Sequence, residues 1–198
     1  MIAWVRDLLR VLLALVMLST VGSEPLLAAT PPAKSPPAGA GLVSVSLLDL
    51  TARVPETWVS QQASSSTRLA QFQLPGKAGS DAAELVVFYF GQGQGGSAEA
   101  NIGRWESQFS SATGKPIKAS VQRFKVRGMP VTTAELTGSY ARTLGMAPPG
   151  AAVPDQTLLA AILETPKGNL FFQLHGPKVI VAANRESFLS MVRGLKKP

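Results

Sequence analysis

The sequence predicts an α+β fold in which helices pack on a single antiparallel β-sheet of about six to eight strands. Three observations carry this prediction. Segments of alternating apolar and polar residues follow one another through most of the chain and are joined by short turns. One strand-like segment has apolar residues at both its odd and its even positions, which is typical of a strand covered on both faces. Two amphipathic segments with helical spacing, one midway and one near the C-terminus, supply the helices.

The stretch from Glu84 to Phe109 has the clearest order of elements in the chain. Residues 85–90 form the apolar segment and predict a buried strand. A loop with four glycines follows, in which the chain can reverse without Cβ clashes, and Ser97 is a favourable N-cap. We expect a helix from there to the neighbourhood of Thr113 and Gly114. Its apolar face consists of Ala98, Ile102, Trp105 and Phe109.

The segments before this stretch predict further strands. Alternation over residues 48–53 indicates the first strand. A proline turn then leads to Trp58, which we expect in the core. Residues 58–62 and 68–74 are expected to pair as a hairpin whose more apolar face carries Ala70, Phe72 and Leu74.

The second half of the chain repeats this pattern. Strands are predicted over residues 119–127, 131–140, 158–164 and 170–175. Residues 144–156 contain three prolines and predict a loop near the length at which loops become lids or disorder. A closing helix is expected from about Asn184 to Lys196. Its apolar face consists of Phe188, Met191, Val192 and Leu195.

The N-terminal part differs in composition from the rest. Arg6 and Arg10 precede an almost unbroken apolar run, and small residues follow it, as in a secretory signal peptide. We therefore expect residues 1–29 to be a signal peptide or an uncleaved anchor, and the protein to be exported to the periplasm or cell surface. Residues 30–41 are rich in proline and alanine and predict an extended linker. Residues 42–198 are expected to form a single globular domain.

Composition narrows the classes of function. The 198-residue chain has no cysteine, which excludes disulfides, thiolate metal sites and cysteine nucleophiles. It has one histidine, whereas structural zinc sites use several His or Cys ligands. We therefore expect no metal and no cofactor. The formal net charge of +7 gives a weak attraction to anionic surfaces.

The order of elements resembles that of the PsbP-like family of α/β/α sandwiches. The resemblance includes Val54-Pro55-x-x-Trp58 near the start and a closing helix that contains Phe188, and it covers about residues 48–197. PsbP itself is an exported, extrinsic subunit of a membrane complex and not a hydrolase. The resemblance therefore implies an accessory or binding role. It assigns no site residues, because none can be matched residue by residue.

The glycine loop and the helix after it form one candidate site. Bare backbone N–H groups and a helix N-terminus attract anions. The glycine spacing differs from the dinucleotide-binding fingerprint, however, and no Gly-Lys-Ser/Thr follows it. Two interpretations stay open: a flexible connection between strand and helix, or a ligand site. The ligand site would consist of Gly93, Gly95, Gly96, Ser97, Asn101 and Arg104.

Arg123, Lys125 and Arg127 form the densest basic feature of the chain. At alternate strand positions they would share one face and repel one another, so an anionic partner would stabilise them. Phospholipid headgroups are the polyanion that an exported domain would meet. The other interpretation is an ordinary solvated sheet face. Nucleic acid is not an expected partner, because it is a poor candidate for a protein outside the cytoplasm.

We therefore expect an exported, non-enzymatic accessory or binding module for a protein, an envelope or membrane surface, or a small ligand. The alternative is an exported hydrolase with its site between residues 91–96 and 144–156. Catalytic patterns are weak in the sequence. The carboxylates are scattered, and no Gly-x-Ser-x-Gly motif accompanies His175, which we expect to be a strand-end residue with no reaction to perform.

Overall fold

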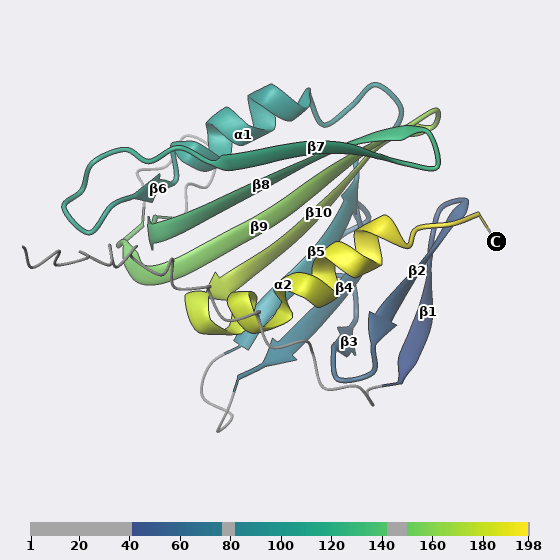
Figure 1. Cartoon of the computed structure of the whole chain (residues 1–198), viewed down its shortest axis with the longest axis horizontal. Helices are drawn as coiled ribbons and strands as arrows, with labels where there is room; N and C mark the ends of the chain where they lie inside the picture. Colours follow the sequence, from purple (N-terminus) through teal and green to yellow (C-terminus); the bar gives the residue numbers. More distant parts are fainter. Residues whose placement is uncertain (1–40, 77–81, 142–149, 198) are drawn as a thin grey trace, which may run out of the picture. The chain divides into compact units, whose positions relative to one another are not determined.

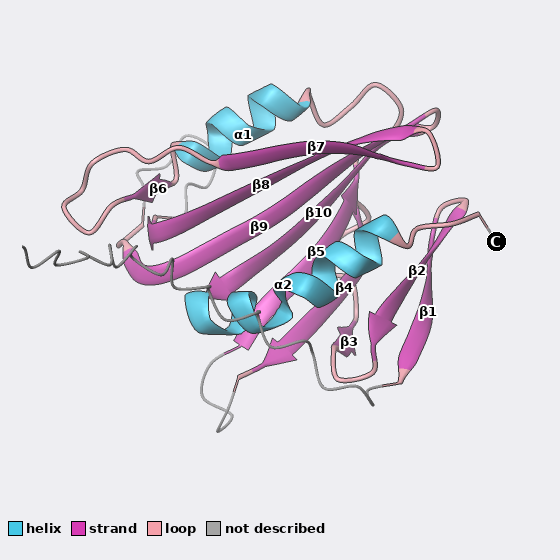
Figure 2. Cartoon of the chain, in the orientation of Figure 1, coloured by secondary structure: helices cyan, strands magenta, loops and turns pink. Residues whose placement is uncertain are grey.

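The computed structural model describes residues 41–76, 82–141 and 150–197 (Figure 1). The predicted signal peptide and almost all of the linker lie outside the described residues. Figure 2 shows the helices and strands in the described part of the chain. In chain order these are β1 (Leu42–Leu47), β2 (Leu50–Pro55), β3 (Val59–Gln61), β4 (Arg68–Pro75), β5 (Ala82–Tyr89), α1 (Ala98–Glu106), β6 (Phe109–Ser110), β7 (Ser120–Val126), β8 (Met129–Tyr140), β9 (Val153–Thr165), β10 (Gly168–Pro177) and α2 (Lys178–Arg193).

Eight of these strands form one antiparallel sheet. Their order is β3-β4-β5-β10-β9-β8-β6, and β7 also pairs with β8. The predicted hairpin is β3 with β4, and the buried strand of the central stretch is β5, which lies between β4 and β10. β1 and β2 form a separate two-stranded hairpin. The predicted α+β fold class is confirmed.

α2 and the β1–β2 hairpin cover one face of the sheet (Figure 1). Phe172 of β10 and Phe188 of α2 are completely buried in this core. Trp58, also in this core, donates a hydrogen bond from Nε1 to Oδ1 of Asn184 over 2.9 Å, which ties the β2–β3 connection to α2. This confirms the prediction that Trp58 enters the core.

α1 packs on the opposite face. Ala98, Ile102 and Trp105 contact buried residues of β8, β9 and β10. In the described part of the chain, one helix therefore lies on each face of the sheet, which confirms the α/β/α sandwich. α1 packs against β8 and β6 and not against β4 or β5. Among the described residues, neither helix is long and apolar enough to cross a membrane.

α1 is shorter than predicted. It ends at Glu106, not near Gly114, because the backbone N–H groups of Ser107 and Gln108 close the last turn on Gly103 and Trp105. Phe109 has the helical spacing of the apolar face, but it lies in β6 and pairs with Tyr140 of β8. Phe109 is therefore buried as part of a short edge strand and not as part of the helix.

α2 begins at Lys178, before the predicted start at Asn184. Its first turn contains the β-branched residues Val179, Ile180 and Val181. These residues have a low helix propensity, so the sequence does not predict a helix at this point. Ile180 and Val181 are buried against the sheet, and this packing outweighs the propensity.

Two further predictions need correction. The first strand of the domain, β1, was not predicted, because its residues are mostly exposed and their alternation is weak. β9 begins at Val153, so residues 153–156 of the predicted long loop are strand. Residues 142–149 of that loop lie outside the described residues.

Candidate functional site

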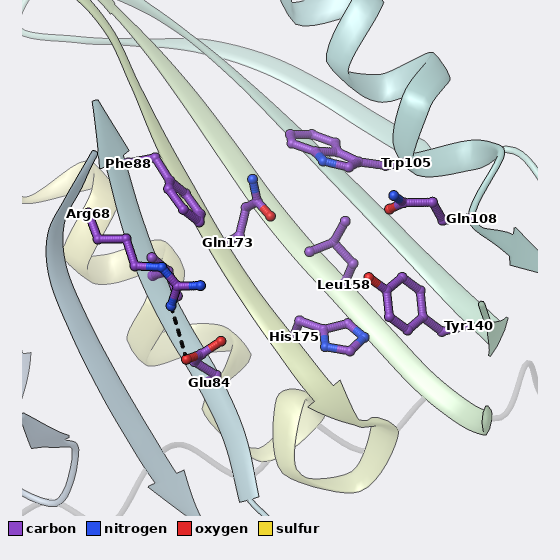
Figure 3. A pocket seen from close by; sticks show the side chains of 10 residues that line it. Arg68, Glu84, Phe88, Trp105, Gln108, Tyr140, Leu158, Gln173 and His175 are labelled. Carbon is purple, nitrogen blue, oxygen red and sulfur yellow. Dashed lines mark hydrogen bonds and ion pairs between the residues drawn. The ribbon is translucent and has the colours of Figure 1, made fainter. Parts of the chain in front are cut away.

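A hollow of about 190 Å³ lies on the α1 face of the sheet (Figure 3). Five neighbouring strands of the sheet, from β4 to β8, contribute to it together with the end of α1. Its rim and floor combine charged, amide and aromatic groups. It is lined by Arg68, Glu84, Val86, Phe88, Trp105, Gln108, Tyr140, Leu158, Gln173 and His175.

Strand register brings the polar residues of this hollow together. Glu84 of β5 is paired with His175 of β10, and Val86 is paired with Gln173. Residues paired directly across antiparallel strands share one face of the sheet. His175 is also paired with Leu158 of β9, so one row of side chains crosses the floor from β5 to β9.

Arg68 and Glu84 form an ion pair at the edge of the hollow. Arg68 donates a hydrogen bond from Nη1 to Oε1 of Glu84 over 3.3 Å, and Gln71 donates from Nε2 to the same oxygen over 2.7 Å. The Arg68 guanidinium also lies over the Phe88 ring, 5.3 Å from its centroid. A β-bulge at this point shifts the β4–β5 register between Arg68 and Ala70, and bulges commonly re-aim a side chain next to a site.

His175 belongs to an aromatic cluster in the wall of the hollow. Its ring centroid lies 4.4 Å from that of Tyr140 and 6.4 Å from that of Phe109. The predicted strand-end position of His175 is thus also a position in a pocket. One feature of the sequence could have indicated a polar site here. Gln173 and His175 lie at alternate positions of a strand whose intervening residues are apolar, so both are expected on the same face of the sheet.

Five of the six residues of the predicted glycine-loop site meet around Asn101, whereas Gly93 lies in the loop with open space at the position of a Cβ. Gly93, Gly95 and Gly96 all have positive φ. Ser97 is the N-cap of α1, and its hydroxyl accepts a hydrogen bond from the N–H of Ala100 over 3.2 Å, as predicted.

The polar side chains of this loop bind one another. Asn101 is buried, and its amide donates to the carbonyl oxygens of Gly95 and Ser97 over 2.8 and 2.9 Å. Arg104 donates to Oδ1 of Asn101 over 2.5 Å. These contacts give the residues a role in holding the loop. Anion binding by the loop stays a prediction.

The predicted basic row is only partly formed. Arg123 and Lys125 are exposed at alternate positions of β7. Arg127 has a φ of 50° and lies in the turn after β7, because the strand ends at Val126, so the expectation that all three share one strand face is wrong. Arg123 lies 3.3 Å from a carboxylate oxygen of Glu99.

The helix N-terminus acts on Glu99. The pKa of its carboxyl is lowered, first by a hydrogen bond from its own backbone N–H and then by Arg123. Contact of this basic row with an anionic surface stays a prediction.

Among the described residues, the two segments of the alternative hydrolase site lie apart. The glycine loop packs against the β9–β10 turn, where a Cβ on Gly168 would come within 2.9 Å of the Gly91 carbonyl oxygen. Gln156 pairs with Pro177 at the opposite end of β9. Residues 91–96 and 153–156 therefore lie at opposite ends of that strand.

The titratable groups that could serve a hydrolase are also apart. Glu164 pairs with Asn169 near the β9–β10 turn, whereas His175 pairs with Leu158 toward the other end of β9. Within the described ranges, no group of three or more His, Asp or Glu side chains could hold a metal ion.

No protein-family model and no curated protein matches the chain. Among solved structures, it is similar to cyanobacterial PsbP from Synechocystis sp. PCC 6803, with 13% identity and a TM-score of 0.49 over 85% of this chain and 100% of that one. It is also similar to a protein of unknown function from Pseudomonas aeruginosa, with 13% identity and a TM-score of 0.47 over 79% of this chain and 97% of that one.

Proposed function

We propose that the chain is an exported, non-enzymatic binding module whose hollow on the α1 face takes a small zwitterionic molecule. One observation carries this proposal: a cation and a carboxylate, Arg68 and Glu84, lie side by side at the edge of a hollow with aromatic walls. We include export in the proposal because the N-terminal sequence has the pattern of a secretory signal peptide.

Arg68 and Glu84 match the two charges of such a ligand. A guanidinium carries five N–H donors and can bind a carboxylate in a bidentate manner, with two parallel hydrogen bonds. Glu84 is 49% exposed, so its carboxylate can accept from a ligand ammonium group. The Arg68–Glu84 contact of 3.3 Å is longer than the roughly 2.7–2.9 Å of a strong charge-assisted hydrogen bond. Its rearrangement on binding therefore costs little.

The size and lining of the hollow restrict the ligand further. Its volume of about 190 Å³ is below the roughly 300–1,000 Å³ of pockets for drug-sized molecules, which favours a small metabolite. The amides of Gln108 and Gln173 offer donors and acceptors. Val86 and Leu158 supply an apolar floor for the ligand's hydrocarbon part.

The chemistry of the lining favours binding over turnover. The described lining contains no serine, threonine or lysine that could attack a substrate. This supports the assignment of the hollow to recognition.

Amide chemical shifts of the full chain, recorded with a panel of amino acids and small betaines, test the proposal. We expect the shifted amides to cluster on β4, β5 and β10 around the hollow. Arg68→Gln should weaken the tightest ligand at least about tenfold, since a charged hydrogen bond contributes about 1.5–3 kcal/mol. Arg53→Gln, which removes an exposed cation from β2, is the matched control. Shifts that cluster elsewhere, or turnover that His175→Ala abolishes, would contradict the proposal.

A further inference from the structure

Several turns and the C-terminal segment meet at one end of the domain (Figure 1). Lys167 in the β9–β10 turn places its Nζ 3.4 Å from Oδ2 of Asp49 in the β1–β2 turn. Lys196, beyond α2, pairs with the start of β2 through backbone hydrogen bonds. The Arg193 guanidinium lies 5.5 Å from the ring centroid of Phe124 of β7, which leads into the β7–β8 turn. We call this region the hairpin end.

The hairpin end is basic. Its exposed cations come from the β7–β8 turn, the β9–β10 turn and the segment around the end of α2. They are Arg127, Lys167, Arg193, Lys196 and Lys197. Two carboxylates, Asp49 and Glu164, lie beside these turns, so this set carries a net charge of +3.

An exposed leucine stands at the tip of the same end. Leu48 is 41% exposed in the two-residue turn between β1 and β2. Its φ of 58° lies in the left-handed region, where glycine and asparagine are favoured and a leucine is strained. A large apolar residue thus occupies a position where turn geometry prefers a small polar one. Local strain of this kind concentrates at functional sites.

We infer that the hairpin end is a contact surface for an anionic lipid bilayer, with Leu48 entering the interface and the surrounding cations facing the headgroups. This surface is separate from the hollow and does not depend on the proposed ligand. Lysine and arginine suit the arrangement, because their long stems place the charge among headgroups while an apolar neighbour goes deeper.

The small apolar area and the net charge of the hairpin end favour a bilayer over a protein partner. A stable protein interface buries about 800 Å² on each side around a desolvated apolar centre. The hairpin end offers one leucine at a protruding turn, which is too little for such a centre. Each basic residue near an anionic membrane strengthens attachment about fivefold, so a net charge of three contributes roughly 100-fold. Burial of the leucine side chain adds about tenfold.

Because the chain lacks cysteine, a dye can be placed at one chosen position of the full chain. We would label Leu48→Cys with an environment-sensitive dye. Val179→Cys, at the start of α2 and 75% exposed, is the control. Each protein is mixed with vesicles of phosphatidylcholine alone or with phosphatidylglycerol added. The local readout separates contact at residue 48 from attachment through the apolar N-terminal segment.

We expect a blue shift at residue 48 with phosphatidylglycerol only, its loss in high salt, and no shift at residue 179. The double variant Lys196→Gln/Lys197→Gln should raise the lipid concentration for half of the response about 30-fold. Lys115→Gln/Lys178→Gln, which removes two exposed lysines outside the hairpin end, should leave it unchanged.

Equal shifts at residues 48 and 179, no shift at residue 48, or equal effects of the two lysine pairs would overturn the inference. A label at residue 48 that ignores vesicles but shifts with an acidic protein partner would overturn it as well. The unlabelled variant Leu48→Asn keeps the test independent of the dye. It should fold and yet cosediment about tenfold more weakly with the anionic vesicles in the same salt series.

Discussion

The side-chain amide of Asn101 donates hydrogen bonds to the carbonyl oxygens of Gly95 and Ser97 and thereby fastens the glycine loop to the first turns of α1. Asn101→Ala removes both bonds inside a buried environment and also deprives Arg104 of its acceptor. We expect the free energy of unfolding to fall by about 2–3 kcal/mol. Urea denaturation followed by tryptophan fluorescence measures this change.

Asn169→Ala is the matched control for Asn101. The Asn169 amide lies 3.5 Å from the Gly96 carbonyl oxygen in an exposed position, so its loss should change stability by less than about 0.5 kcal/mol. Equal effects of the two substitutions would show that the loop is not held by Asn101.

Gly95 and Gly93 differ in the space around them. Both have positive φ, so alanine at either position costs about 1 kcal/mol of backbone strain. A Cβ on Gly95 would also come within 2.6 Å of Phe171 and 2.9 Å of Phe90, whereas nothing lies within 4 Å of one on Gly93. We expect Gly95→Ala to destabilise by roughly 2 kcal/mol more than Gly93→Ala in thermal or urea unfolding. Similar losses for the two variants would contradict this packing role.

Much of the fold could be predicted because burial and period agree. Ala70, Phe72 and Leu74 alternate along β4 and are all buried on one face, as predicted. The errors arose where tertiary contacts outweigh local preference. The β-branched first turn of α2 is held by burial, and Phe109 continues a helical face but pairs in a strand.

The hollow could not be predicted, because it depends on register between strands that are distant in sequence. Glu84 and His175 meet only because β10 lies beside β5, and nothing local sets that order. Arg68 joins them through a bulge, which has no signature in the chain. The glycine loop could be predicted, because a cluster of glycines indicates an unusual backbone conformation. The spacing of the glycines could not show whether the loop is a ligand site or is held by Asn101.

Glu106 should make stability depend on pH. Its pKa is lowered, first by the hydrogen bond from Lys118, at 2.7 Å, and then by the backbone N–H of Ala119, at 3.0 Å. A lowered pKa in the folded state gives stability that is present above the unfolded value of 4.5 and is lost as pH falls through the folded pKa. Glu106→Gln should therefore cost about 1–2 kcal/mol at pH 7 and almost nothing at about pH 2.

Urea denaturation from about pH 2 to pH 7 measures the effect of Glu106. Lys118→Gln removes the first cause and leaves the Ala119 hydrogen bond, so it should abolish only part of the pH dependence. A Glu106→Gln penalty that stays constant across this range would show that the carboxylate contributes through packing and not through its charge.

Leu48→Asn should make the domain more stable while weakening its attachment to anionic vesicles. Asparagine tolerates the φ of 58° that strains leucine, and it is common in tight turns. Because Leu48 is 41% exposed, little packing is lost, so the free energy of unfolding should rise by about 1 kcal/mol. Thermal unfolding in the absence of lipid measures the gain, and Leu48→Ala, which keeps the strain but removes the side chain, is the control. A leucine whose replacement improves folding has a purpose outside the fold, whereas a loss of stability in Leu48→Asn would mean that the side chain serves the hairpin itself.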